Sequence, residues 1–143
     1  MNLQPPRLFI DTNVWFSTFY GSPTCEKLLK AHIEGTIVAV VSTQVLKELV
    51  NNIQEKIPVA LPAFEKLIAT APPLTLQDPK AINPKVKSLV HPKDQKVFCS
   101  ILDVENIRYF ITGNTKHFSK TKLKKVTGVT VLTPKEAANQ FQL

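Results

Sequence analysis

The chain has 143 residues, of which 43% are hydrophobic and 20% charged. This composition is typical of a folded domain and excludes an intrinsically disordered chain, and the longest apolar run, Ile37–Val41, is too short to cross a membrane. The formal net charge of +7 favours a polyanionic partner, most simply a nucleic acid.

The first part of the sequence predicts strands that alternate with helices. Apolar runs rich in β-branched residues indicate strands, helical spacing of apolar residues indicates helices, and Gly21-Ser22-Pro23 marks a turn between two helices. The elements expected here are strands at 7–11 and 37–41, helices at 13–20 and 24–34, and a helix from a Ser42 or Thr43 cap to Pro58.

The second part begins with a proline-rich stretch, which holds seven of the eleven prolines between Pro58 and Pro92. We expect a rigid surface connection there, with a short helix at 62–70 and an edge strand at 74–76. The remaining elements expected are a helix at 94–105, strands at 109–112 and 129–132, and a final helix opened by Pro134. This alternation predicts an α/β protein with a mostly parallel sheet and a single domain over residues 1–143.

Asp11 is the most informative acid, because it follows an apolar strand directly and precedes a helix. Open α/β sheets place their chemistry in the crevice beyond the carboxyl ends of the strands. Thr12 and Asn13 are short polar residues that can hydrogen-bond in this turn and hold the carboxylate in place.

Asp94 lies on the apolar face of its predicted helix. Val97, Phe98 and Ile101 follow it by three, four and seven positions, which places all four residues on one side of the helix. An ordinary helix N-cap is the alternative for this acid. Asp103 lies about 180° around the same helix, so we expect it to be a solvated surface acid.

Two further oxygen-bearing side chains follow strands of the predicted sheet. Glu48 lies one helix beyond the second strand, outside the core stripe, where a solvated acid is the alternative. Asn114 follows the strand at 109–112, where a Gly-Asn turn is the alternative. Carboxylate and amide oxygens at one edge of a sheet suit Mg²⁺ or Mn²⁺.

Several other residues are assigned by their chemistry. Cys25 and Cys99 make no metal-type pair and are expected to be free thiols in a reducing compartment, so we expect a cytoplasmic protein. His91 and His117 flank the proposed site, and a bystander role is preferred to that of a general acid. The basic segment 113–128 begins at the site edge and is either an RNA-binding surface or a solvated connection, with Lys116, Lys120 and Lys122 as its candidate RNA contacts.

Taken together, these motifs resemble those of the PIN domain family, in particular its VapC-type toxins. The resemblance rests on five segments along nearly the whole chain, which are FIDTNVWF, VSTQVLKELV, HPKDQKVFCSIL, YFITGNTKHF and VTVLTPKEAANQF. It implies a three-layer α/β/α sandwich around a short parallel sheet and the activity of a metal-dependent ribonuclease. It also implies that the protein is the toxin of a toxin–antitoxin pair, with a cognate antitoxin as partner, and leaves a homodimer open.

The resemblance implies a role for each matching residue. Asp11, Glu48 and Asp94 would hold Mg²⁺ or Mn²⁺ and carry the catalysis, while Asn114 stands where many members have a fourth acid. This departure lowers the charge of the site from four negatives to three, so a second metal ion would bind more weakly. Thr12, Asn13 and Thr112 would position the carboxylates or a phosphate oxygen.

Two alternatives to an active ribonuclease remain. The first is a PIN-like module that binds RNA or a protein partner and has weak or no catalysis, which Asn114 makes credible. The second is a haloacid-dehalogenase-type phosphatase, which also begins with a strand and an acid. That family needs a second Asp two residues after the first, where this chain has Asn13, and the sequence leaves no room for a cap domain.

Overall fold

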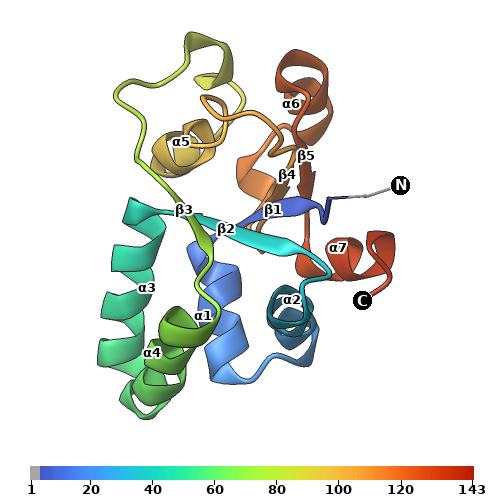
Figure 1. Cartoon of the computed structure of the whole chain (residues 1–143). Coiled ribbons are helices and arrows are strands. Elements are labelled where there is room, and N and C mark those ends of the chain that lie inside the picture. Colours follow the sequence, from blue (N-terminus) through green and yellow to red (C-terminus); the bar gives the residue numbers. More distant parts are fainter. Residues whose placement is uncertain (1–3) are drawn as a thin grey trace.

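The computed structural model describes residues 4–143 and has a central five-stranded sheet in which every strand pair is parallel (Figure 1). The strands lie in the order β3-β2-β1-β4-β5. Their bounds are β1 Arg7–Ile10, β2 Val38–Ser42, β3 Leu74–Leu76, β4 Tyr109–Ile111 and β5 Thr130–Leu132. The predicted fold class is therefore confirmed, with a sheet that is parallel throughout.

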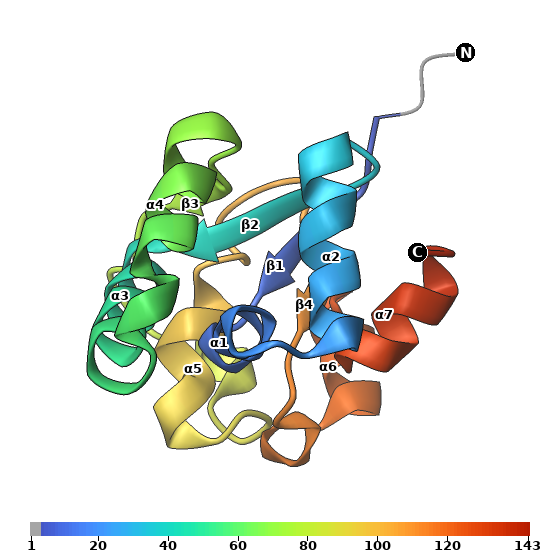
Figure 2. The ribbon, with the colours of Figure 1, turned by 90° about the horizontal axis from the view of Figure 1, so that it is seen from below.

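Helices cover both faces of this sheet and make the three layers of the sandwich. Those that pack below the sheet in Figure 1 are α1 Thr12–Tyr20, α2 Pro23–Glu34, α3 Thr43–Lys56 and α4 Leu61–Thr70, with α7 Pro134–Gln140 beside α2. The opposite face carries α5 Pro92–Cys99 and α6 Lys120–Thr127. Figure 2 shows α1 beneath the centre of the sheet.

The strand order creates a switch point between β1 and β4. From β1 the chain moves outward on one side, to β2 and then β3, and later returns to place β4 and β5 on the other side. The segments that leave β1 and β4 therefore diverge to opposite faces of the sheet. In open parallel sheets this divergence opens a crevice at the carboxyl ends of the two strands, which is the usual position of a ligand site.

The core beneath this crevice is apolar and aromatic. Phe9 of β1 stacks on Phe110 of β4, with ring centroids 5.1 Å apart and planes 7° apart. Phe98 of α5 and Phe118 pack against Phe110 at 5.3 Å and 5.2 Å. Phe118 is buried, and this aromatic packing forms the core beneath the switch point.

The helix expected at 94–105 is shorter and begins earlier, at Pro92–Cys99. Pro92 occupies the first helical turn, where its missing N–H costs nothing. At the other end, the hydroxyl of Ser100 donates to the carbonyl of Val97 at 2.6 Å, and the next residues form tight turns instead of an α-helix. The helical-phase argument for Asp103 was therefore wrong, although Asp103 is exposed as predicted.

The segment 113–128 contains a helix that the sequence analysis did not predict. Its helix α6 has a single buried residue, Leu123, so it lacks the repeated apolar spacing that indicates a helix. Gly128 ends it with a φ of +78°, a left-handed conformation that suits glycine, and two lysines stand in its last turn. These end signals, more than periodicity, distinguish α6 in the sequence.

Both cysteines are buried as free thiols, as expected. Within residues 4–143, no helix combines the length and the apolar character that crossing a membrane requires.

Candidate metal centre

The acid that follows β1 lies at the switch point. The backbone N–H of Asp11 donates to the carbonyl of Ile111 in β4 at 2.9 Å, so the ladder between the two strands continues through this residue. Its side chain caps α1 and accepts the N–H of Thr12 at 2.8 Å. The sheet on one side and the helix N-terminus on the other therefore fix this carboxylate at the strand edge.

Asp11 is only 6% exposed, and this burial dominates its electrostatics. Desolvation raises the pKa of its carboxyl group from 3.8 to about 6, against the opposing effect of hydrogen bonds from Thr12 and Thr112. The charges of Asp94 and Glu48 raise this pKa further, so both acids lie within electrostatic range. Among residues 4–143, no lysine or arginine forms an ion pair with any of the three carboxylates.

A small network of polar side chains surrounds the carboxylate of Asp11. The buried hydroxyl of Thr112 donates to Oδ2 at 3.0 Å, and the amide of Asn13 lies 3.2 Å from the same oxygen. Asn13 in turn accepts the backbone N–H of Gly113 at 2.8 Å. A Cβ at Gly113 would lie 3.1 Å from the Asn13 carbonyl oxygen, so a side chain there would crowd this network.

Glu48 reaches the same edge from α3. The hydroxyl of Thr12 donates to its Oε2 at 2.9 Å, and the side-chain amide of Gln44 donates to its Oε1 at 3.0 Å. Each oxygen therefore keeps lone pairs that are free for a cation. Thr12 contacts Asp11 through its backbone and Glu48 through its side chain, and so links the two acids.

Asp94 stands in the first turn of α5, with its side chain 18% exposed. It is not the cap of this helix, because His91 has that position and accepts the backbone N–H of Lys93 at 3.2 Å. The N-cap alternative for Asp94 was therefore wrong. Its Oδ2 instead lies 2.7 Å from Nδ1 of His117, which the chain brings from the other side of the site.

Asn114 lies beside this network through its backbone. Its N–H donates to the hydroxyl oxygen of Thr112 at 3.1 Å, whereas its exposed side chain does not cap the short 3-10 helix that follows. Asn114 thus lies two residues after Thr112, which contacts Asp11. No hydrogen bond joins the side-chain amide of Asn114 to Asp11, Glu48 or Asp94.

The three candidate RNA-binding lysines lie farther along the same segment. Lys116 and Lys122 are exposed, and Lys120 forms an ion pair with Glu136 of α7 at 3.2 Å. Lys120 is therefore partly neutralised, while Lys122 on α6 is open to solvent.

The sequence analysis missed the contact that His117 makes with Asp94. The two residues are 23 positions apart, and their approach depends on a bridge between Val90 and Phe118 that joins two loops. No local pattern indicates such a bridge. The sequence did offer one indication of this contact: two of its three histidines, His91 and His117, flank the predicted site that contains Asp94.

The chemistry of the donor set fits a hard divalent cation. Asp11 is a buried carboxylate with a raised pKa, and it lies within electrostatic range of two further acids. Within residues 4–143 it has no basic partner, so this arrangement concentrates negative charge unfavourably. Carboxylate and carboxamide oxygens are the ligands that Mg²⁺ and Mn²⁺ prefer. A bound cation would remove the electrostatic cost that the sheet and helix impose on Asp11.

Comparisons with known proteins support the fold. No family model matches the sequence, and no curated protein matches it. Among solved structures, the chain is similar to one in a crystal structure of VapBC2 from Rickettsia felis bound to a DNA fragment from its promoter. The TM-score is 0.62 at 11% sequence identity, and the match covers 89% of this chain and 98% of the other.

Proposed function

We propose that the protein is a PIN-type ribonuclease that depends on Mg²⁺ or Mn²⁺ and acts as the toxin of a toxin–antitoxin pair. One observation carries the proposal: the buried carboxylate of Asp11 lies at the switch point of a parallel sheet, within electrostatic range of two other acids and, among residues 4–143, without a basic partner. The likeness in fold to a chain of VapBC2 supports the same proposal.

In this proposal Asp11 and Asp94 are ligands of the cation, and Glu48 is either a third ligand or the base that accepts a proton from the attacking water. The carbonyl oxygen of the Asn114 side chain is a neutral fourth donor. When bound, Mg²⁺ or Mn²⁺ would supply positive charge for the phosphate oxygens and lower the pKa of a coordinated water.

The surrounding residues keep these groups in position. Thr112 and Asn13 hold Oδ2 of Asp11 and the backbone N–H of Thr12 holds Oδ1, which leaves a lone pair of Oδ1 for the cation. Thr12 holds Oε2 of Glu48 and thereby sets the distance between α3 and the switch point. Because these contacts exist before substrate binds, little reorganisation is needed during the reaction.

RNA is the proposed substrate because the chain carries a net charge of +7 and a lysine-rich segment that starts at the site edge. We assign phosphate contacts to Lys116 and Lys122, with a smaller contribution from Lys120 because Glu136 competes for it. The whole chain would act as one domain, with an antitoxin as its protein partner and a second copy as a further candidate partner.

Asn114 favours one alternative, a PIN-like module that binds RNA or a protein but cleaves slowly or not at all. With a neutral side chain at this position, the site has three negative charges instead of four. The backbone N–H of Asn114 donates to the hydroxyl of Thr112 and keeps the loop in place. Metal binding would therefore persist even if cleavage were lost. The phosphatase alternative is weaker, because Asn13 is a hydrogen-bonding partner of Asp11 and Gly113 and not a second acid.

The test is an RNA-cleavage assay with a pool of end-labelled RNAs and purified protein, in EDTA, Mg²⁺ or Mn²⁺. We expect cleavage only with the metal ions and its loss in Asp11→Asn and in Asp94→Asn. Metal binding without cleavage of any RNA in the pool would favour the binding module. Hydrolysis of p-nitrophenyl phosphate by the same preparation would favour the phosphatase.

A further inference from the structure

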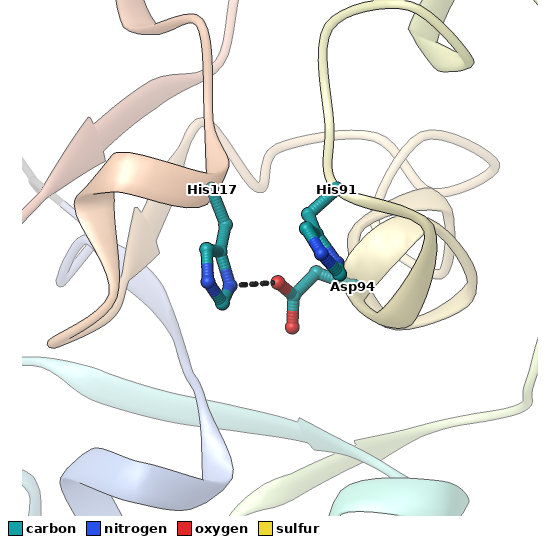
Figure 3. A group of neighbouring side chains, drawn as sticks. All are labelled: His91, Asp94 and His117. Carbon is teal, nitrogen blue, oxygen red and sulfur yellow. Dashed lines mark hydrogen bonds and ion pairs between the residues drawn. The ribbon is translucent and has the colours of Figure 1, made fainter.

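A second group of metal-binding side chains lies next to the carboxylates, on the outer side of Asp94. His91, Asp94 and His117 each offer one ligand atom, and these atoms all lie within 4.8 Å of one another. Figure 3 shows the carboxylate of Asp94 beside the two imidazole rings and hydrogen-bonded to that of His117; the rings come from different segments of the chain. Two of the three histidines in the sequence meet here.

The backbone holds the two histidines side by side. The N–H of His91 donates to the carbonyl of His117 at 2.8 Å, and the N–H of Ser119 donates to the carbonyl of Leu89 at 2.8 Å. These bonds flank the antiparallel bridge between Val90 and Phe118. The cluster is therefore built on a hydrogen-bonded crossing of two loops, beside a cavity of about 350 Å³ that both histidines line.

The nitrogens of the two rings are accessible to a metal ion. Asp94 accepts a hydrogen bond from Nδ1 of His117, so the lone pair of Nε2 is free and lies on the side of the ring away from Asp94. His91 uses Nδ1 only for the 3.2 Å contact with the exposed backbone of Lys93. His32 provides the contrast, because its two ring nitrogens contact Ala71 and Ala39.

We propose that His91, Asp94 and His117 form a binding site for a divalent transition-metal ion that prefers nitrogen ligands, with Zn²⁺ as its representative. Two imidazoles and one carboxylate are a ligand set that suits Zn²⁺, Co²⁺ or Ni²⁺, whereas Mg²⁺ binds through oxygen. Three protein ligands leave a fourth position for water. The site is distinct from the all-oxygen site assigned to Mg²⁺, and the two share Asp94.

Binding requires a small rearrangement of side chains. The rings now stack, with centroids 4.6 Å apart and planes 26° apart, so their nitrogens do not yet point at a common centre. The ligand atoms of a tetrahedral Zn²⁺ site lie about 3.4 Å apart, given Zn–N distances near 2.1 Å. Binding of one ion by both His117 and Asp94 breaks the 2.7 Å hydrogen bond between them, and rotation of the two rings on the backbone crossing turns a nitrogen of each toward the ion.

The shared carboxylate gives the site a regulatory consequence, which rests on the proposed ribonuclease function. Zn²⁺ held by the two histidines takes Asp94 away from the oxygen site, so Zn²⁺ and Mg²⁺ compete through one residue. Inhibition of RNA cleavage by Zn²⁺ should then weaken when either histidine is replaced.

The direct test uses the full chain without a polyhistidine tag, stripped of metal and titrated with Co²⁺ in the absence of RNA. We expect visible Co²⁺ absorption bands that saturate at one ion per chain and that Zn²⁺ displaces. Loss of a residue that only hydrogen-bonds to a metal ligand lowers metal affinity roughly 10- to 100-fold. In His91→Asn and in His117→Gln, the Zn²⁺ affinity measured by calorimetry should fall by more than this, because each change removes a direct ligand.

The variants are chosen to preserve the fold. Asparagine is a good N-cap and can keep the contact with the Lys93 N–H, while glutamine at 117 can still donate to Asp94. Asp103→Asn is the matched control for Asp94→Asn, since it removes an exposed carboxylate outside the cluster, and it should bind Co²⁺ as the unchanged chain does.

Some outcomes would overturn the proposal. One is a chain without Co²⁺ bands at saturating metal, and another is a His91→Asn, His117→Gln double variant with unchanged Zn²⁺ affinity. Asp11→Asn separates this proposal from the ribonuclease. This variant should lose RNA cleavage and keep the Co²⁺ absorption bands. The ribonuclease proposal and the Zn²⁺-site proposal can therefore fail independently of each other.

Discussion

Two opposing effects act on the carboxyl group of Asp11. Burial disfavours its charged form, whereas the hydrogen bonds from Thr12 and Thr112 favour it. In the unfolded chain its pKa is the ordinary value near 3.8, and in the folded protein burial raises it to about 6. The folded state therefore binds a proton more tightly than the unfolded state between these values. It follows that this group makes the metal-free protein less stable as pH rises from about 4 to about 6, and the loss then persists at neutral pH.

Asp11→Asn should therefore stabilise the metal-free protein at neutral pH while it removes activity. The gain is on the order of 1 to 3 kcal/mol above pH 6 and vanishes below pH 4, where the carboxyl group is protonated in both states. Asparagine retains the N-cap of α1, so the helix is not disturbed. Urea unfolding in EDTA at pH 4 and pH 7.5 measures the difference, and equal stability of the two proteins at pH 7.5 would contradict it.

Asn114→Asp should strengthen Mg²⁺ binding by severalfold, up to about tenfold, which corresponds to 1.4 kcal/mol. The new carboxylate would restore a fourth charge at a position whose backbone already contacts Thr112. Asn139→Asp on the exposed face of α7 is the control for a general increase in negative charge. Calorimetric titration with Mg²⁺ compares the three proteins, and an equal effect of both substitutions would mean that Asn114 does not face the metal.

Sequence reasoning at this scale proposed the acids from their positions after strands and at a helix start. It did not find how they are connected. The links from Thr12 to Glu48 and from His117 to Asp94 join residues 36 and 23 positions apart. Such contacts depend on the packing of whole elements, which no local spacing encodes.

At the level of elements, the C-terminal end of α5 separates Asp94 from Asp103. The helix ends at Cys99, and Asp103 lies in the turns beyond it, exposed to solvent. Asp94 in its first turn faces His117 and contributes to the pKa of Asp11. The separation of the two acids is thus set by the end of the helix and not by their phase on it.

Asp103→Asn should consequently leave RNA cleavage within about twofold of the original rate, whereas Asp94→Asn should reduce it at least about a hundredfold. Initial rates on one RNA at saturating Mg²⁺ give the comparison. A large loss in Asp103→Asn would mean that the turns after α5, and not its first turn, contribute to the site.

Helix α6 supplies Lys122, one of the two exposed lysines of the proposed RNA surface. Lys122→Ala should weaken RNA binding and lower the slope of log K against log salt by about 0.7, the value for one phosphate contact on a single strand. Lys30→Ala on α2, at the opposite face of the sheet, should leave the slope unchanged. Filter binding with Asp11→Asn as the background prevents cleavage, and equal slopes for both lysine variants would remove α6 from the RNA surface.

The elements themselves were largely predictable, because each strand is an apolar run and most helices carry an apolar stripe. The errors have physical causes. After α5 the backbone N–H groups of Ser100, Ile101 and Leu102 donate to the carbonyls three residues before them, so the α-helical hydrogen bonds give way to tight turns. In α6 only Leu123 is buried, so the sequence of this mostly polar helix lacks the regular spacing of apolar residues that indicates a helix.

At the scale of the whole molecule, the strand order explains why these residues meet at all. With β1 beside β4, the end of the first strand and the end of a strand about one hundred residues later form one edge. Asp11 and Thr112 occupy equivalent positions after the two strands and hydrogen-bond at 3.0 Å. The alternation of strands and helices predicted a parallel sheet, but the order of its strands is set by long-range packing.

The proposed function requires that the acids at this edge of the sheet hold one hard divalent cation. An anomalous difference map from crystals grown with Mn²⁺ tests it most directly. We predict a peak about 2 to 2.3 Å from a carboxylate oxygen of Asp11, shared with Asp94 or Glu48. Full occupancy of Mn²⁺ elsewhere with no peak against Asp11 would contradict the account.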